Sequence, residues 1–525
     1  MSEPSGPDPQ NSEPSGPDPR SGEPSGPDPQ NSEPSGPDPG EPGPSDLLGE
    51  RRAKLERLRA EGIEPFPHEF GDREEIGEVR SAHVGLSPGV ETESRHRVAG
   101  RLIARRGHGK AAFLDLRDAS GQIQLHARED VLGPEAFELL VHLDLGDIVG
   151  VEGRAFATRR GELSLEVSEW KLLAKSLRPP PDKFHGLEDT ETRYRRRELD
   201  LIANEESRRL FAVRAATVSE VRRWLDDHGF VEVETPVLQP LYGGALARPF
   251  TTHHNALDRD LYLRIATELY LKRCVVGGMD RVYELGRDFR NEGISQKHNP
   301  EFTMLEWYEA YADYGKTAHD LELLVAEVAE RVLGTAVIER GGRRIDLSPP
   351  WRRETLREAI LERTGIDVAE HPSREALAEA MDAEPDPHEG WGKLVDGLLS
   401  RSVEPELLEP TFITDYPVEL SPFAKSHRSE PGLVERWEAF VGGIEIANSF
   451  SELNDPDEQR RRFEMQAEEL RRGDEEAQPY DESFVEALEQ GMPPTGGVGL
   501  GIDRLVMLLT GARTLREVLL FPAMR

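Results

Sequence analysis

The 525-residue sequence predicts an α+β protein in which a small β-barrel precedes a larger antiparallel sheet flanked by helices. Three observations predict this class. Residues 97–172 contain about five short segments that alternate apolar and polar side chains, as half-buried strands do. A long helical pattern follows at residues 205–228. Beyond it, strand and helix patterns mix without the regular alternation of a parallel sheet.

The N-terminal 45 residues are a proline-, serine- and glycine-rich repeat with a period of ten residues, and they hold nine acids and one base. The repeat has no large apolar side chain, so it cannot bury enough surface to offset the entropy lost on ordering. We expect residues 1–45 to be a disordered acidic tail, and a solvated extension is a simpler interpretation than an interaction tail.

A barrel is predicted for residues 46–180, with a short basic helix at residues 46–62 in front of it. Leu114 and Leu116 alternate with Asp115, and residues 118–121 form a hairpin turn signal. Several short strands within about 75 residues favour a Greek-key barrel of the OB type. Basic side chains near its turns are suited to single-stranded nucleic acid; they are Arg101, Arg105, Arg106, Lys110, Arg159 and Arg160.

The composition limits the possible partners and compartments. A net charge of −35 opposes a general attraction for nucleic acid, so any RNA contact must come from a local basic patch. The sequence has no apolar run long enough to span a membrane, and its first residues do not form a secretory signal. The single cysteine, Cys274, excludes an intramolecular disulfide and is interpreted as a small buried hydrophobe, which suits the reducing cytoplasm.

Three prolines at residues 179–181 begin a linker, predicted for residues 181–204, and the remaining residues 205–525 form the second part. Its first helix is predicted to stop at Gly229. A strand follows at residues 230–235, where Val231 and Val233 alternate with glutamates, and Pro236 ends it.

Two later segments carry the residue types that bind nucleotides. Residues 287–308 are interpreted as two strands joined by a loop, with Arg290 and Glu292 on one strand face. On the second strand, Phe302, Met304, Glu306 and Tyr308 share one face. An arginine beside an aromatic ring can hold a phosphate while the ring stacks on a base. Taken alone, Arg290 and Glu292 also fit a simple strand salt bridge.

The last segment, residues 499–504, reads Gly-Leu-Gly-Ile-Asp-Arg and runs into an apolar helix. Small residues allow a nucleotide to approach the backbone, and Arg504 at the helix start can reach over the base or towards the phosphates. Packing alone would also explain the glycines.

In order, the helix–strand ended by Pro236, the Arg-x-Glu segment and the Gly-x-Gly-x-Asp-Arg segment resemble the three signature motifs of class II aminoacyl-tRNA synthetases. The resemblance implies a homodimer with the first motif at its interface, and an antiparallel sheet that binds ATP. It implies that Arg290 holds the α-phosphate and Glu292 the adenine amino group. It also implies that Phe302 and Arg504 sandwich the adenine, with His298 near the β- and γ-phosphates.

Several carboxylates point to the choice of amino acid. Glu268, Glu306 and Glu452 accompany aromatic residues, and Asn448, Phe450 and Glu452 alternate on one strand face. Carboxylates gathered in a small site are costly unless a cation compensates them. A cationic side chain with a long alkyl stem fits such a pocket, whereas an aspartate site would need a cation.

From about residue 50 to 525 the sequence resembles the bacterial lysyl-tRNA synthetases most closely, for example at residues 252–258, 289–302 and 521–525. The resemblance implies that the barrel binds the anticodon of tRNA(Lys), and that Glu438 and Glu445 bind Mg²⁺ with ATP. Gly244 and Glu268 would hold the backbone or ammonium of the amino acid. The implied lysine site also includes Glu306, Tyr308, Asn448, Phe450 and Glu452.

Glu445 does not fit this implied arrangement on a regular strand, because it is out of phase with Asn448 and Phe450. A β-bulge between Ile446 and Asn448 would bring Glu445 to the same face.

The expected reaction is activation of lysine by ATP to lysyl-adenylate, followed by transfer to the 3′ end of tRNA(Lys), with no side-chain nucleophile. Lysyl transfer to elongation factor P remains an alternative, as does a class II synthetase for aspartate or asparagine. The pair His253-His254 has no third metal ligand at a suitable spacing, so a structural role is expected for it.

Overall fold

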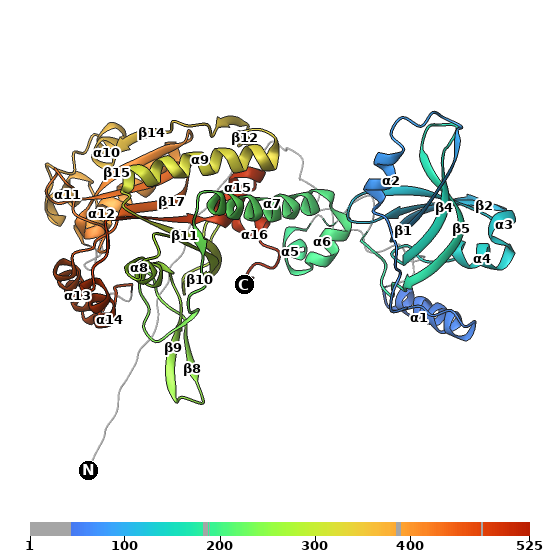
Figure 1. The fold of residues 1–525 in the computed structure, drawn as a ribbon, viewed down its shortest axis with the longest axis horizontal. Coiled ribbons are helices and arrows are strands. Elements are labelled where there is room, and N and C mark those ends of the chain that lie inside the picture. Colours follow the sequence, from blue (N-terminus) through green and yellow to red (C-terminus); the bar gives the residue numbers. More distant parts are fainter. Residues whose placement is uncertain (1–43, 182–186, 188, 385–389, 474–475, 525) are drawn as a thin grey trace, which may run out of the picture. The chain divides into compact units, whose positions relative to one another are not determined.

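The computed structural model describes residues 44–181, 187, 189–384, 390–473 and 476–524 (Figure 1). Of the expected tail at residues 1–45, residues 1–43 lie outside the described residues. The chain divides between Pro179 and Pro180 into two compact units.

The first unit is a closed five-stranded barrel with the strand order β1-β2-β3-β5-β4, which confirms the predicted OB type of architecture (Figure 1). Its strands are β1 (Glu91–His108), β2 (Ala111–Arg117), β3 (Gln122–Arg128), β4 (Ile148–Ala157) and β5 (Leu163–Ala174). Its helices are α1 (Pro44–Ala60), α2 (Ile76–Ala82), α3 (Glu129–Leu132) and α4 (Pro134–Val141).

Alternation along the strands fills the barrel with apolar side chains. Leu114 and Leu116 on β2 are fully buried, as are Ile123 and Leu125 on β3. The predicted turn between these strands is present, since the Asp118 carboxylate accepts hydrogen bonds from the backbone N–H groups of Ser120 (2.8 Å) and Gly121 (2.9 Å).

The second unit is built on an eight-stranded sheet with the order β14-β15-β16-β17-β18-β11-β10-β6. Its inner pairs are antiparallel, as predicted, while β14 pairs with β15 and β6 pairs with β10 in parallel. The strands are β6 (Val231–Glu232), β10 (Arg281–Phe289), β11 (Glu301–Ala310), β14 (Arg352–Thr355), β15 (Thr411–Pro417), β16 (Leu433–Val441), β17 (Ile444–Ser451) and β18 (Thr495–Gly501).

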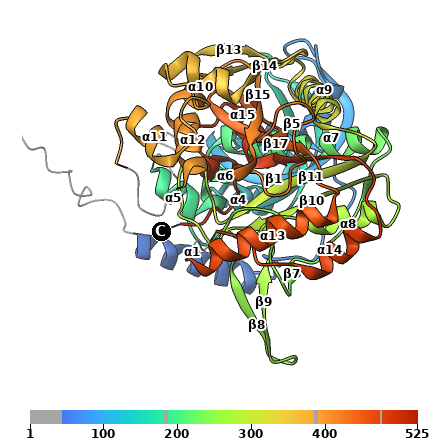
Figure 2. The same ribbon diagram turned by 90° about the vertical axis from the view of Figure 1, so that its left-hand side faces the viewer.

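Helices surround this sheet (Figures 1 and 2). They are α5 (Thr190–Arg195), α6 (Arg197–Ala203), α7 (Glu205–Asp227), α8 (Glu268–Val276), α9 (Tyr314–Leu333), α10 (Leu356–Thr364), α11 (Arg374–Ala380), α12 (Trp391–Leu398), α13 (Pro456–Arg471), α14 (Glu482–Glu489), α15 (Ile502–Thr510) and α16 (Leu515–Val518). Short 3-10 and π turns lie at Leu399–Val403, Glu404–Glu406 and Val418–Leu420. No helix among the described residues is both long and apolar enough to cross a membrane.

The two faces of β11 have different roles. Leu305 and Trp307 are fully buried in a core shared with α7, α9 and α15. Because side chains alternate along a strand, Phe302, Met304, Glu306 and Tyr308 lie on the opposite face, as predicted, and all four line a pocket.

Five short strands of the described chain lie outside the main sheet. Three of them form one sheet in the order β7-β9-β8: β7 (Leu238–Gln239), β8 (Thr251–His254) and β9 (Arg259–Leu263). The other two, β12 (Val337–Arg340) and β13 (Arg343–Asp346), form a separate pair. The β8–β9 hairpin projects from the second unit in both views (Figures 1 and 2).

The strand predicted at residues 230–235 is shorter than expected. Only Val231 and Glu232 form β6, and half of the Val231 surface is exposed. The chain then leaves the ladder, since the backbone N–H and hydroxyl of Thr235 both donate to the Glu284 carboxylate (3.1 and 2.7 Å). Beyond β6, the hydrogen bonds of Thr235 to the Glu284 side chain therefore take the place of the predicted strand pairing.

Candidate active site

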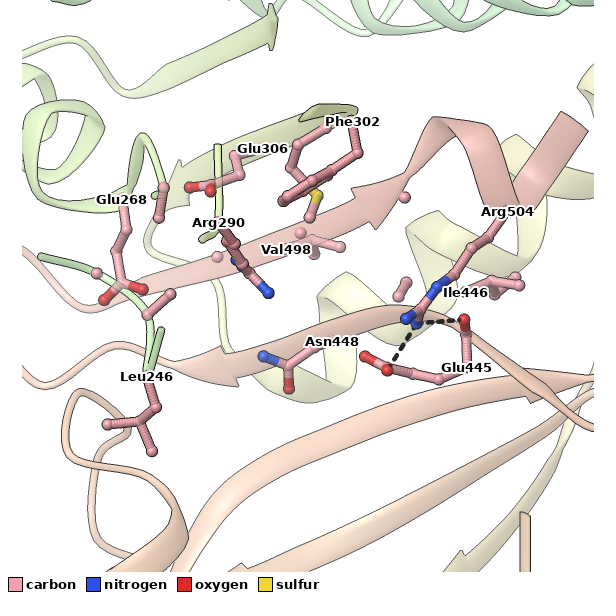
Figure 3. A pocket seen from close by; sticks show the side chains of 18 of the residues that line it. Leu246, Glu268, Arg290, Phe302, Glu306, Glu445, Ile446, Asn448, Val498 and Arg504 are labelled. Carbon is pink, nitrogen blue, oxygen red and sulfur yellow. Dashed lines mark hydrogen bonds and ion pairs between the residues drawn. The ribbon is translucent and has the colours of Figure 1, made fainter. Parts of the chain in front are cut away.

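A cavity of about 320 Å³ opens on the face of the sheet opposite α7 and α9, within the size range of small-molecule sites. All the predicted site residues line it except Glu438. Those that line it are Gly244, Glu268, Arg290, Glu292, His298, Phe302, Glu306, Tyr308, Glu445, Asn448, Phe450, Glu452 and Arg504. Figure 3 shows Glu268 at one end of the pocket, Arg504 and Glu445 at the other, and Arg290 and Asn448 between them.

Glycines on β18 make room for this cavity. A Cβ added at Gly497 would clash with Glu452 Oε1 and would lie 2.8 Å from Tyr308 Cδ1. At Gly499 an added Cβ would meet nothing closer than 3.8 Å. Gly497 therefore sets the size of the pocket beside Glu452 and Tyr308.

Between the two ends of the pocket, Arg290 lies beside an aromatic ring. The guanidinium carbon of Arg290 lies 5.1 Å from the centre of the Phe302 ring, and Nε donates to the carbonyl of Ile265 (3.4 Å). The predicted placement of Arg290 and Glu292 on a strand face is wrong. The last pair of the β10–β11 ladder is Phe289 with Glu301, so both residues lie in the connecting loop, where they still line the pocket.

Arg504 lies in the first turn of α15, directly after the glycine-rich β18. Its Nη1 donates to the backbone carbonyl of Glu445 (2.9 Å) and to its carboxylate (2.8 Å), as Figure 3 shows. Burial would raise the pKa of Glu445, but the guanidinium outweighs it and lowers that pKa. The neighbouring Asp503 fixes the start of α15, because its carboxylate accepts from the backbone N–H of Thr303 on β11 (2.9 Å).

A β-bulge brings Glu445 and Asn448 into the same pocket. Ala439 on β16 pairs with Ala447, and the next residue, Phe440, pairs with Glu445, so Ile446 is the extra residue. The predicted bulge is thus present, and it lies at Ile446, the first residue of the stretch in which it was predicted.

The other end of the pocket holds three buried carboxylates, Glu268, Glu306 and Glu452. Glu306 accepts hydrogen bonds from the backbone N–H of Thr267 (3.2 Å) and from the Tyr308 hydroxyl (3.2 Å). Burial, together with the nearby carboxylates of Asp288 and Glu268, raises the pKa of Glu306 to about 8.

Glu452 is the least satisfied of the three carboxylates. It is only 1% exposed, and its Oε1 has no hydrogen-bond partner within the described part of the chain. Burial raises the pKa of its carboxyl well above the usual value. An unpaired buried carboxylate oxygen is costly, so this end of the pocket is suited to a cationic ligand.

Two basic residues of the pocket region were not identified from the sequence. Lys272, one helical turn after Glu268, pairs with Glu268 (2.7 Å) and with Glu452. Arg436 donates to Asn448 (2.9 Å) and to Glu438 (2.5 Å). Both could have been found from spacing, because Lys272 is four residues from Glu268 on a helix and Arg436 is two residues from Glu438 on a strand.

Glu438 lies beside the pocket with 12% of its side chain exposed, and it accepts from the Tyr416 hydroxyl (2.9 Å) and from Arg436. Burial and the nearby Glu445 raise its pKa to about 7. Two neighbouring carboxylates, of which Glu445 disfavours the charge of Glu438, fit a divalent cation with oxygen ligands. In the described part of the chain no three His, Cys, Asp or Glu side chains could hold a metal ion by themselves, so phosphate oxygens would have to complete such a site.

Gly244 and His298 lie at the margins of the pocket. Gly244 has a φ of +90°, and an added Cβ would lie 3.0 Å from Glu268 Cβ, so the backbone approaches Glu268 closely there. His298 Nδ1 pairs with the Ser295 hydroxyl (2.9 Å) within the β10–β11 loop. Away from the pocket, His253 pairs with Asp260 (2.8 Å) on the β8–β9 hairpin.

Comparison with known proteins agrees with this geometry. Residues 189–525 match the family of tRNA synthetases class II (D, K and N), and residues 96–173 match the OB-fold nucleic acid binding domain. The lysine–tRNA ligases of Moorella thermoacetica and Synechococcus sp. are each 52% identical over 92% of this chain, which covers 98% and 99% of those proteins. The lysine–tRNA ligase of Bacillus subtilis is 50% identical over 92% of this chain and 97% of its own length. The chain belongs to the class II tRNA synthetases, in the lysine–tRNA ligase family.

Proposed function

We propose that this pocket activates lysine with ATP and that the chain then transfers the lysyl group to the 3′ end of tRNA(Lys). The single observation that carries the proposal is the division of the pocket (Figure 3). Phe302 and Arg504 lie towards one end and the buried carboxylate of Glu268 at the other, with Arg290 and Glu306 between them. The names of the relatives support the same reaction.

In the first step the lysine carboxylate attacks the α-phosphorus of ATP in line, and pyrophosphate leaves. Arg290 would hold the α-phosphate, where charge increases in the transition state. Phe302 and Arg504 would sandwich the adenine, Glu292 would accept from its amino group, and His298 would lie near the outer phosphates. The protein thus positions the two reactants and needs no side-chain nucleophile.

Mg²⁺ would bind to Glu438 and Glu445 together with phosphate oxygens, and when bound it would neutralise negative charge on the phosphates. Glu445 already pairs with Arg504 through its carboxylate. The same carboxylate would therefore keep Arg504 oriented over the nucleotide.

The cationic ends of lysine would lie among the carboxylates. Glu306, Glu452 and Tyr308 would bind the side-chain ammonium, with Phe450 along the alkyl stem and Asn448 beside it. Gly244 and Glu268 would bind the α-ammonium. The unpartnered Oε1 of Glu452 supports this assignment, because it is a buried acceptor without a donor in the described chain.

In the second step the terminal ribose hydroxyl of the tRNA attacks the adenylate carbonyl, and AMP leaves. The tRNA acceptor is supported by the match of residues 96–173 to a nucleic acid binding domain. We assign residues 1–45 to the tail, 46–180 to the anticodon-binding barrel, 181–204 to a linker that includes α5 and α6, and 205–525 to the catalytic domain.

A homodimer in the cytoplasm completes the proposal. Exposed apolar side chains occur in the first motif and directly after it, where Val231, Val237 and Leu238 have exposed fractions of 50%, 41% and 47%. Apolar surface of this kind favours a protein interface. Sedimentation at several concentrations tests the dimer.

Amino-acid-dependent exchange of pyrophosphate into ATP tests the substrate. We expect exchange with lysine and none with aspartate or asparagine, because the carboxylates would repel an acidic side chain and Asn448 alone would not satisfy an amide. Exchange with aspartate or asparagine but not lysine would overturn the proposal. Transfer to tRNA(Lys) and to elongation factor P, measured side by side, decides the acceptor.

A further inference from the structure

We infer that Lys272 is a built-in cation of the amino-acid pocket, a positioning residue that holds Glu268 and Glu452 in place and favours their ionised form. The inference rests on the proposed lysine activation and concerns the selectivity of the same pocket.

The contacts of Lys272 are unusual for a lysine. Its side chain is completely buried, whereas lysine is almost never fully buried unless it is paired. Nζ lies 2.7 Å from Glu268 Oε1 on its own helix and also contacts Glu452 Oε2, which follows β17. It therefore joins the two carboxylates from separate elements.

Aromatic rings complete the surroundings of the ammonium. Nζ lies 5.3 Å from the centre of the Phe423 ring and 5.6 Å from that of Phe450. Burial acts to lower the pKa of Lys272, but Glu268 and Glu452 outweigh it and raise the pKa, so the side chain stays charged.

The other charged and titratable groups come from the elements packed around α8. Glu306 and Tyr308 face the site from β11, and Arg436 reaches towards Glu268 from β16. Asp288 on β10 is already paired with Arg264 (3.1 Å). From α14 the helix meets the apolar side chains Phe484, Val485 and Leu488.

The contacts of Lys272 show what it does. It pairs with one oxygen of Glu268 and one oxygen of Glu452, and Oε1 of Glu452 keeps no partner among the described residues. Lys272 therefore offsets part of the buried acidic charge and leaves an acceptor for the ammonium of a cationic ligand.

Without Lys272 the pocket would bind protons more strongly. An opposite charge within about 4–6 Å lowers the pKa of a carboxyl group by roughly 1–3 units, so the loss of Lys272 would raise the pKa of Glu268 and of Glu452 further. Lysine would then have to displace those protons, and its binding would improve as the pH rises.

The test is Lys272→Met, which keeps most of the side-chain volume and removes the charge. In lysine-dependent pyrophosphate exchange near pH 7 we expect the KM for lysine to rise about tenfold or more, with the KM for ATP within about twofold of the wild type. Between about pH 6.5 and 8.5 the KM for lysine should fall much more steeply in the variant than in the wild type.

Lys175→Met is the matched control, because Lys175 is also buried and paired with two acids, Asp144 (2.7 Å) and Asp147 (2.8 Å), but lies in the barrel unit. It should keep the wild-type pH profile of exchange. An unchanged KM and pH profile in Lys272→Met would overturn the inference. Tighter lysine binding would also overturn it, since Lys272 would then occupy the place of a substrate ammonium. If the wild type itself shows no lysine-dependent exchange, the proposed function fails instead.

If Lys272→Met does not fold, Lys272→Gln decides, because it removes the charge but keeps a hydrogen-bond donor between Glu268 and Glu452. We expect the same rise in the KM for lysine and the same steeper dependence on pH. A folded Lys272→Gln protein with the wild-type KM and pH profile would overturn the inference.

Discussion

At the scale of single residues, the pocket gathers groups whose protonation depends on what they bind. Glu306 is the clearest case, because burial and two neighbouring carboxylates raise its pKa to about 8 from the ordinary value of 4.5. The sequence indicated this residue through its place in the Glu306-x-Tyr308 alternation. It could not indicate the shift, which depends on Asp288 and Glu268 from other elements.

Glu306→Gln should flatten the dependence of stability on pH in the absence of lysine. Between about pH 4.5 and 8, Glu306 keeps its proton in the folded protein, whereas the unfolded chain has released it. The stability that this proton contributes is therefore complete below about pH 4.5 and is lost as the pH rises towards 8. In urea unfolding between about pH 5 and 8, the free energy of unfolding of the wild type should fall by on the order of 1 kcal/mol per pH unit more than that of the variant. Parallel pH dependences would contradict the assignment.

Cys274 should be dispensable. It is half-buried on α8, and burial raises the pKa of its thiol, so little reactive thiolate exists at neutral pH. We expect Cys274→Ala to keep lysine-dependent exchange within about twofold of the wild type, at a cost in stability on the order of 1 kcal/mol. Loss of exchange in a folded variant would show that the thiol has a role in the pocket.

At the scale of elements, the strand periodicity predicted the faces of β11 and β17, and the phase conflict at Glu445 predicted the bulge at Ile446. Two features did not follow from local pattern. Arg290 and Glu292 lie in a loop because the ladder ends at Phe289, and β6 is short because Thr235 pairs with Glu284. Both depend on partners that are distant in the sequence.

The glycine-rich β18 yields a prediction about pocket size. Gly497→Ala would place a methyl group against Glu452 and Tyr308, so the KM for lysine should rise by about tenfold or more while the KM for ATP changes little. Gly499→Ala adds a methyl group that meets nothing within 3.8 Å, which makes it the control for folding of the strand in thermal unfolding. Wild-type lysine affinity in a folded Gly497→Ala protein would show that the substrate does not lie beside this glycine.

At the scale of the whole molecule, two units with separate cores imply that activation and tRNA binding are separable functions. The barrel carries an aromatic row in which Phe113 and His126 stack at 4.6 Å, with Phe156 at 5.7 Å from His126. The sequence predicted the barrel, but this row needs the pairing of β2 with β3, which places Phe113 opposite His126.

Phe113→Ala should therefore raise the KM for tRNA without changing pyrophosphate exchange. Stacking of a base on an aromatic ring contributes about 1–3 kcal/mol, which corresponds to roughly tenfold or more in the KM for tRNA. Aminoacylation at varied tRNA concentration measures it. If exchange weakened as much as aminoacylation, the two functions would not be separable in this way.

The most direct test of the central claim, that one pocket joins a nucleotide end to a lysine end, is lysine-dependent pyrophosphate exchange by Arg290→Ala. Because Arg290 would stabilise charge on the α-phosphate, we expect exchange to fall by about 10²–10³-fold in a protein that unfolds at the wild-type temperature. Exchange at the wild-type rate would contradict the account.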